Sequence, residues 1–179
     1  DINGCFNEDT VVVDVIELTE ANAGQDTAIC EDVVSITLTA FPANGNWSGN
    51  GIDNFGVYQI SQPGDFEFYY SIGSGSCYDK DSITITVNPL PVISISPDFN
   101  ICIDADTVDL SESPYGGIWS GTGITNTTDG IFNPDIATVG NYLLTYSFTI
   151  DSTGCSDQSD ITAFVRPKPV SAFQIDSPI

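Results

Sequence analysis

The amino-acid sequence predicts an all-β protein made of tandem β-sandwich repeats. Three observations lead to this fold class: an internal repeat, a strand-like alternation of apolar and polar residues, and turn-forming residues at short intervals. No window of ten residues has the apolar spacing and the caps of a helix.

The internal repeat is the strongest of these signals. Residues 30–52 and 102–124 align without a gap, and residues 64–70 resemble residues 140–146. A second cysteine follows the tyrosine-rich segment of each copy. The matching residues of the two copies are Cys30, Trp47, Gly49, Gly51, Ile52 and Cys77 in the first, and Cys102, Trp119, Gly121, Gly123, Ile124 and Cys155 in the second.

The strands are predicted where Thr, Ser or Glu alternates with Ile, Val, Leu or an aromatic residue. Such runs occupy residues 35–39, 66–70, 82–87 and 93–96. Short strands separated by Gly, Asn, Asp or Pro, in a copy of roughly 72–78 residues, are typical of a seven-stranded immunoglobulin-like (Ig-like) sandwich. The two tryptophans share one register, and we expect them in the core between the sheets; an exposed sugar-stacking platform is the alternative.

Proline linkers divide the chain. Each full repeat ends on a strand followed by residues 89–91 or 167–169, and prolines there favour an extended backbone. We therefore expect the repeats to follow one another end to end with few contacts. The predicted segments are residues 1–20, the last strand of a preceding repeat with its strand at 11–15; 21–90, the first repeat; 91–168, the second repeat; and 169–179, the start of a further module.

Composition excludes several functions. The 179 residues include 3 basic and 25 acidic residues, a formal charge of -22, which repels nucleic acid and anionic lipid. No stretch approaches the roughly 18 apolar residues of a membrane span, so no direct membrane insertion is expected. The sequence has no histidine, and nothing singles out a pair of carboxylates for glycoside hydrolysis. We therefore predict that the chain is not an enzyme.

The W-S-G-x-G-I segment, the cysteine before it, the later G-x-(Y/F)-x-(L/F)-x-Y strand and the C-x-D turn resemble the Ig-like and PKD-like repeats of large secreted surface proteins of Bacteroidetes. That group includes adhesins associated with gliding motility and type IX secretion. The resemblance covers residues 22–169, and residues 168–173 resemble the opening of a PKD-like module, which gives the segment 169–179 its expected identity.

The resemblance implies an extracellular or outer-surface location and no catalytic residues. The function expected is a structural and interaction module in an extended cell-surface stalk or adhesin filament. The alternative is a glycan- or protein-binding accessory module of a secreted multidomain protein. The implied partners are neighbouring repeats of the same chain and a surface glycan or protein ligand.

Two disulfide pairings remain open. Because the resembling family carries both cysteines in each repeat, it favours Cys30 with Cys77 and Cys102 with Cys155, leaving Cys5 unpaired. Ig strand order places those cysteines at opposite ends of a repeat, and a seven-residue strand spans about 23 Å whereas a disulfide tolerates at most about 7 Å between Cα atoms. That geometry favours Cys30 with Cys155.

Acidic residues flank the cysteines in both copies. Oxygen clusters of this kind bind Ca²⁺, which is the one cofactor the sequence suggests. The alternative is that acidic loops keep the surface soluble, since no D-x-D-x-D-G loop is present. The residues concerned are Asp26, Asp32, Asp79, Asp98, Asp104 and Asp157.

A short Asp-Ser or Asp-Thr motif recurs five times and resembles the O-glycosylation signal of Bacteroidetes secreted proteins. The alternative is ordinary turn chemistry, since such pairs are common where turns enter strands. The hydroxyls expected to carry sugar are those of Thr10, Thr27, Ser82, Thr107 and Ser152.

Overall fold

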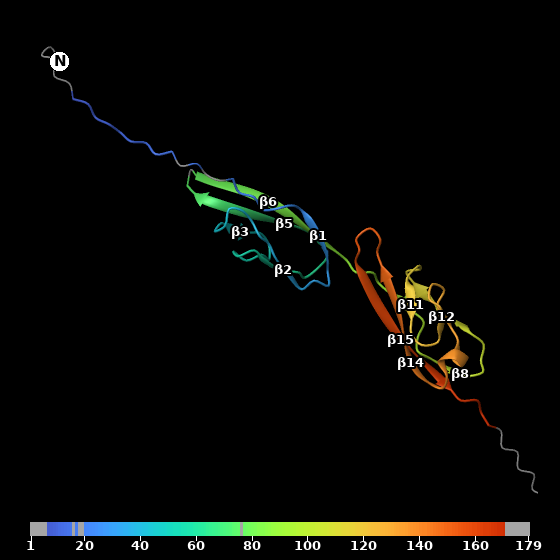
Figure 1. The fold of residues 1–179 in the computed structure, drawn as a ribbon. Helices are drawn as coiled ribbons and strands as arrows, with labels where there is room; N and C mark the ends of the chain where they lie inside the picture. Colours follow the sequence, from blue (N-terminus) through green and yellow to red (C-terminus); the bar gives the residue numbers. More distant parts are fainter. Residues whose placement is uncertain (1–6, 16, 18–19, 76, 171–179) are drawn as a thin grey trace, which may run out of the picture. The chain divides into compact units, whose positions relative to one another are not determined.

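The computed structural model describes residues 7–15, 17, 20–75 and 77–170, and they divide into two compact units (Figure 1). The first unit comprises the described residues within 1–27, 35–60 and 65–85. The second comprises residues 28–34, 61–64 and those from 86 onward. Below, "first repeat" and "second repeat" keep their sequence ranges, 21–90 and 91–168.

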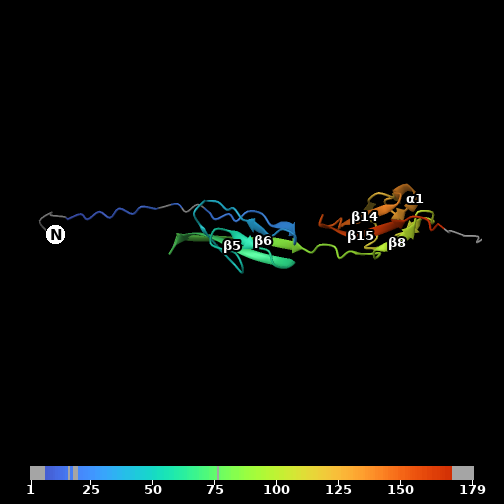
Figure 2. The same cartoon turned by 90° about the horizontal axis from the view of Figure 1, so that it is seen from below.

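The first repeat contains a four-stranded sheet in the order β1-β6-β5-β3 and a two-stranded sheet, β2-β4. Its strands are β1 (Thr27–Cys30), β2 (Ser35–Thr37), β3 (Asn46–Ser48), β4 (Val57–Gln59), β5 (Gly64–Ser74) and β6 (Cys77–Asn88). The two long strands, β5 and β6, neighbour each other in the larger sheet (Figure 2).

The second repeat has the same plan, with a four-stranded sheet β8-β15-β14-β11 opposite the smaller sheets β12-β13-β9 and β10-β7. Its one helix, α1 (Pro134–Ala137), is a single turn. The strands are β7 (Ser94–Ile95), β8 (Phe99–Cys102), β9 (Val108–Asp109), β10 (Glu112–Ser113), β11 (Ile118–Ser120), β12 (Ile124–Asn126), β13 (Ile131–Phe132), β14 (Gly140–Thr149) and β15 (Ser156–Arg166).

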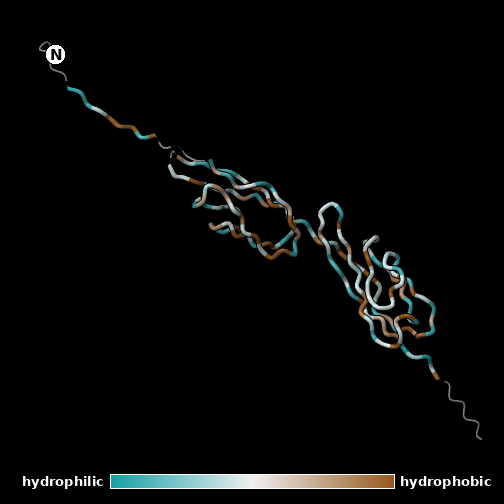
Figure 3. Tube along the Cα trace, viewed as in Figure 1, coloured by the Kyte–Doolittle hydropathy of each residue, from teal (hydrophilic) through white to brown (hydrophobic). Residues whose placement is uncertain are grey.

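The all-β, Ig-like sandwich prediction is confirmed. In the four-stranded sheet of the second repeat, β8 pairs with β15 in parallel. β14 pairs with β15 antiparallel over the full length of β14. The predicted strand runs at 35–39, 66–70, 82–87 and 93–96 fall on β2, β5, β6 and β7. Alternation placed them correctly because buried residues recur at every second position, as along β6. Figure 3 colours the trace by hydropathy, and hydrophobic and hydrophilic residues follow one another along both repeats.

The core of each repeat forms between its two layers. In the second repeat, buried side chains of β11, β14 and β15 meet those of β13: Trp119, Leu144, Tyr146, Ile161, Ala163 and Val165 pack with Leu110, Phe132 and Ala137. In the first repeat, Trp47 is 4% exposed and packs on Tyr70 with ring centroids 5.2 Å apart. Trp119 and Tyr146 repeat that contact at 5.2 Å. The prediction of core tryptophans is therefore confirmed.

A tyrosine fixes the loop before each tryptophan. The Tyr146 hydroxyl donates to the Pro114 carbonyl (2.6 Å) and accepts from the Gly117 N–H (2.7 Å). In the first repeat, the hydroxyl of Tyr70 makes the same two bonds, to the Pro42 carbonyl and from the Gly45 N–H. A side chain at residue 117 would collide with the tyrosine ring, because a Cβ there would lie 2.5 Å from Tyr146 Cζ.

The strand predicted at residues 11–15 is not formed. Residues 7–15 have no regular secondary structure, and Val11, Val12, Val13 and Val15 are exposed. A strand needs a neighbour to satisfy its backbone hydrogen bonds, and none of the described strands pairs with this segment. A run of β-branched residues alone therefore did not produce a strand here.

Candidate functional site

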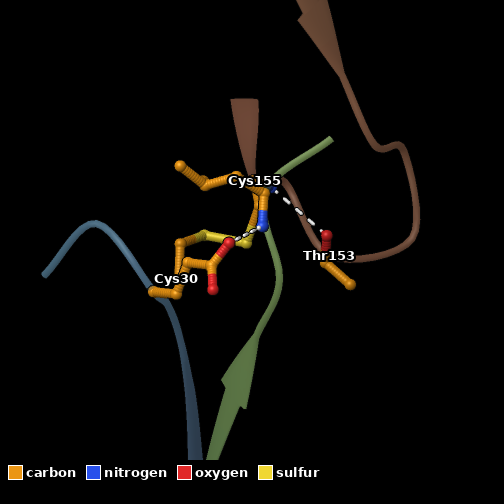
Figure 4. The surroundings of a disulfide bond; sticks show 5 residues. Cys30, Thr153 and Cys155 are labelled. Carbon is orange, nitrogen blue, oxygen red and sulfur yellow. Dashed lines mark hydrogen bonds between the residues drawn. A yellow bond between two sulfur atoms is a disulfide. The ribbon is translucent and has the colours of Figure 1, made fainter. Parts of the chain in front are cut away.

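A disulfide joins Cys30, the last residue of β1, to Cys155 in the hairpin between β14 and β15 (Figure 4). The two Cα atoms are 5.6 Å apart, within the usual range for this bond. Cys155 is 1% exposed, and its N–H donates to the Thr153 hydroxyl oxygen at 3.3 Å. Residues 28–34 belong to the second compact unit, so both ends of the bond lie in that unit.

The pairing within each repeat, which the family resemblance favoured, is wrong. Cys30 and Cys155 bond to each other, while Cys77 and Cys102 are exposed free thiols. The reason is geometric: β1 ends beside the last residues of β6, whereas Cys77 begins that 12-residue strand at its other end. A strand of that length separates its ends by about 40 Å. The alternative pairing expected from strand order is confirmed.

Cys5 lies outside the described residues, and its predicted lack of a partner stays a prediction.

Three of the six acidic candidates, Asp26, Asp79 and Asp98, accept hydrogen bonds from the main chain of segments far away in the sequence. Equivalent contacts recur in both repeats: Asp26 Oδ1 accepts from the Thr84 N–H at 2.7 Å, and Asp98 Oδ1 accepts from the Thr162 N–H at 2.7 Å. Asp79 accepts from the N–H of Ala21 at 2.6 Å. These carboxylates therefore dock the first strand of a repeat, or the segment before it, onto the last strand.

The remaining acidic candidates lie at the surface. Asp104 forms an ion pair with Lys168 at 2.8 Å, and the hydrogen bond from Lys168 holds the pKa of that carboxyl below its usual value. Asp157 accepts from the N–H of Gln158, and Asp32 is exposed. In the described part of the chain, no three Asp, Glu, Cys or His side chains gather in a group that could hold a metal ion. The Ca²⁺ suggestion therefore remains a prediction without an assembled site.

The five candidate glycosylation hydroxyls are all exposed. They occur on a segment without regular structure, on strands β1 and β6, and in turns, at Thr10, Thr27, Ser82, Thr107 and Ser152. An enzyme can therefore reach each of them in the folded protein, which the motif requires but does not by itself establish.

An open pocket of about 510 Å³ lies beside Trp47 in the first repeat, and the sequence analysis did not predict it. Phe55, 84% exposed, lines it together with Asn44, Asn46 and Asn54. An exposed aromatic ring among amides suits a polyhydroxylated or peptide ligand.

One difference between the repeats accompanies this pocket. Residue 112 of the second repeat is a glutamate whose carboxylate accepts from the Trp119 indole N–H at 3.1 Å. Ala40, which aligns with it, also lines the pocket and leaves this space beside the Trp47 indole open. The sequence shows that Ala40 stands where the second repeat has Glu112. This difference predicts a pocket only once the structure shows that residue 112 contacts the tryptophan indole.

Comparisons with known proteins return weak structural likenesses. No protein-family model matches the chain, and no curated protein matches it. Among solved structures, the chain is similar to Drosophila N-cadherin EC1-3 (14% identity, TM-score 0.32), Sidekick-1 immunoglobulin domains 1-4 (12%, 0.37) and titin domains I67-I69 (12%, 0.34). These matches cover 80%, 84% and 82% of this chain and 65%, 51% and 64% of the other chains, respectively.

The chain therefore spans less than two thirds of each of these structures. Similarity at this level assigns no ligand or partner, so functional inference rests on the residues described above. Within the described residues, no helix has the length and apolarity needed to cross a membrane.

Proposed function

We propose that the chain is a structural and interaction module, in which tandem Ig-like repeats form part of an extended stalk of a secreted cell-surface adhesin. The observation that carries the proposal is the covalent link between the sequence repeats, Cys30 to Cys155, together with two copies of one fold plan. A disulfide of this kind suits an oxidising compartment outside the cytosol. A chain of repeats stapled in this way resists unravelling under load.

The extended form follows from the linkers and the charge. Prolines at 89, 91, 167 and 169 favour extended backbone, and a charge of -22 opposes folding back of one repeat on another. Small-angle scattering of the oxidised protein tests this part: we expect a rod-like distance distribution with a maximum dimension near the sum of two repeats. A distribution typical of a compact globule contradicts it.

The surface location has its own test. Antibodies against residues 21–168, applied to unbroken cells of the native organism, should label filaments in electron micrographs. Labelling only after cell lysis contradicts a surface stalk. The motif at Thr10, Thr27, Ser82, Thr107 and Ser152 adds a second readout, because peptide mass spectra of native protein should show sugar on these hydroxyls. If all five hydroxyls are unmodified, the motif is not a glycosylation signal here, and its recurrence reflects the frequent use of Asp, Ser and Thr in turns.

The second candidate function is ligand binding at the pocket beside Trp47. The exposed Phe55 ring and the three Asn amides favour a glycan, because sugars stack on aromatic faces and bond to amides. Binding of the oxidised protein to a glycan array, compared with Phe55→Ala and Ala40→Glu, tests it. Ala40→Glu places in the first repeat the carboxylate found at residue 112. Equal array signals for all three proteins exclude the pocket as the binding site.

A further inference from the structure

We propose that Cys77 and Cys102 form the same bond as Cys30 and Cys155, each with a neighbouring repeat of the same kind. In this arrangement Cys102 bonds the hairpin cysteine of a following repeat, and Cys77 bonds the first cysteine of a preceding one. The inference rests on the equivalence of positions in the repeat and does not depend on the surface location or the adhesive role proposed above.

The first cysteines of the two repeats occupy the same structural position. Cys30 ends β1 and Cys102 ends β8. After β1, the Glu31 N–H donates to the carbonyl of Asn88 at 3.0 Å, and after β8 the Ile103 N–H donates to the carbonyl of Arg166 at 2.9 Å. Both cysteine carbonyls then accept a turn hydrogen bond from three residues on, at 3.2 and 3.1 Å. The main chain therefore presents Cys102 as it presents Cys30.

The second cysteines also match. Cys155 directly precedes β15 and Cys77 opens β6, each at the tip of the long hairpin of its repeat. Cys155 is buried in its bond, whereas Cys77 is exposed and free. The two equivalent positions differ in that the first cysteine Cys30 lies against Cys155, whereas none of the described cysteines is bonded to Cys77.

The linker leaves each repeat close to its first cysteine. In the first repeat the Leu90 N–H donates to Glu31 Oε1 at 2.9 Å, next in sequence to Cys30. In the second repeat Lys168 pairs with Asp104, two residues after Cys102. Different groups therefore hold the two linkers beside equivalent cysteines. A repeat attached through residues 167–169 is tethered within a short linker of Cys102, as Cys155 is tethered to Cys30.

The turn after the first cysteine occupies an equivalent place in the two repeats. Residues 28–34, which carry Cys30, belong by their contacts to the unit that contains Cys155 and not to the unit formed by most of their own repeat. That unit also contains the end of β6, where the Asn88 carbonyl accepts from the Glu31 N–H, so the grouping follows the pairing of β1 with its own sheet as well as the disulfide. Residues 103–106 form the equivalent turn after Cys102.

The bond forms by thiol–disulfide exchange with a small-molecule disulfide such as oxidised glutathione. The Cys102 thiolate attacks the small disulfide and releases one reduced thiol. The Cys77 thiolate of the neighbour then displaces the second. Two protein thiols and one small disulfide become one protein disulfide and two small thiols, so atoms and electrons balance.

The experiment uses a second copy of the chain as the neighbouring repeat. Both proteins carry Cys5→Ser; one also carries Cys77→Ser and keeps Cys102, and the other also carries Cys102→Ser and keeps Cys77. Neither can close a bond between Cys77 and Cys102 within one chain. One protein is labelled with ¹⁵N, and equal amounts are mixed in a buffer of reduced and oxidised glutathione. Peptide mapping first verifies that Cys30–Cys155 is intact in both.

We expect the mixed dimer, joined through Cys102 and Cys77, to exceed each same-protein dimer at least tenfold. Random collision of exposed thiols gives the mixed dimer only twice the amount of each same-protein dimer. That statistical ratio, an excess of same-protein dimers, or monomers capped only by glutathione would each overturn the proposal. None of these outcomes depends on where the protein resides, so they leave the stalk proposal to its own tests.

Discussion

At the scale of single residues, the two repeats share one arrangement of a tryptophan, a tyrosine, a proline and a glycine in the core. A tryptophan lies on a tyrosine, and that tyrosine bridges a proline carbonyl and a glycine N–H. A second glycine, residue 130, contacts the edge of the Trp119 indole, where a Cβ would lie 2.6 Å from Nε1. Both repeats therefore depend on the same polar brace inside an apolar core.

The brace predicts a stability loss for Tyr146→Phe. The change leaves the Pro114 carbonyl and the Gly117 N–H without their buried partner, which costs about 1–3 kcal/mol in the free energy of unfolding. Urea denaturation at pH 7 measures it. Tyr142→Phe is the matched control, because Tyr142 is partly exposed and its hydroxyl hydrogen-bonds to the exposed Thr138 hydroxyl. Equal stability of both variants would contradict a structural role for the brace.

The same tyrosine predicts sensitivity to alkali. Burial, with a smaller effect of Glu112, raises the pKa of Tyr146 above its usual value. The folded protein thus keeps the proton at a pH where the unfolded chain releases it. The stabilisation is complete below about pH 10 and is lost as pH rises through the folded-state pKa. Between about pH 9 and pH 11, we expect Tyr146→Phe to lose less unfolding free energy than the parent; parallel losses would contradict the assignment.

Gly130 predicts a backbone and packing effect. Its φ is +65°, and Gly130→Ala would add a collision with Trp119 to the strain of a left-handed alanine, for a cost of about 2–4 kcal/mol. Gly116→Ala separates the two causes, since residue 116 also has a positive φ of +98° but a Cβ there meets nothing within 4 Å. We expect Gly116→Ala to cost about 1 kcal/mol. Thermal unfolding of the two variants side by side measures the difference. Equal melting temperatures would contradict a contribution from the collision with Trp119.

At the scale of elements, the parallel placement of the first strand beside the last decides the cysteine chemistry. β8 runs along the end of β15, with Cys102 opposite Arg166, so the first cysteine of a repeat lies at the end where the linker departs. The second cysteine lies at the far tip of the hairpin. This arrangement explains why Cys30 bonds Cys155 of the second repeat and not Cys77 of its own.

The bond between these elements predicts a large effect of Cys155→Ser. Closing a loop over a sequence separation of 125 residues stabilises the folded state by up to about 5 kcal/mol in the chain-entropy model. Urea denaturation of Cys155→Ser should show this loss, and adding a reductant to the parent protein should reproduce it. Cys77→Ser is the matched control, because that thiol is exposed and free, and we expect no change. A parent insensitive to reductant would contradict the contribution of the bond.

At the scale of the whole molecule, charge is the dominant property. The chain has 3 basic and 25 acidic residues, so ion pairs such as Asp104–Lys168 neutralise little of the negative charge. Repulsion among the carboxylates opposes compact states and is screened within about 10 Å at 0.1 M salt. Stability should therefore depend on ionic strength across the molecule.

The charge and the Ca²⁺ suggestion make distinguishable predictions. If the salt only screens charge, it stabilises each repeat by about 1 kcal/mol and raises the melting temperature by a few degrees. NaCl and CaCl₂ then have the same effect at matched ionic strength. We expect this outcome, because Asp26, Asp79 and Asp98 already accept main-chain hydrogen bonds. Scanning calorimetry with MgCl₂ as the divalent control measures it. A further rise that saturates below about 1 mM Ca²⁺ and is absent with Mg²⁺ would reveal a specific site.

The sequence by itself determined the fold class, the repeat, the main strands and the buried tryptophans. Those features depend on local alternation and on matching residues at a fixed spacing, which a sequence displays directly. The five motif hydroxyls were also selected from a local pattern, and their glycosylation stays a prediction.

Only the tertiary structure decided the disulfide, the tyrosine brace, the pocket beside Trp47 and the absence of a strand at residues 11–15. Each depends on which distant segments come within a few ångströms of one another. Cys30 and Cys77 belong to one repeat, yet the length of β6 keeps them apart, while Cys155 lies 5.6 Å from Cys30 between Cα atoms. The valine-rich run at 11–15 has a high strand propensity but pairs with none of the described strands, and a strand exists only where a neighbour accepts its hydrogen bonds.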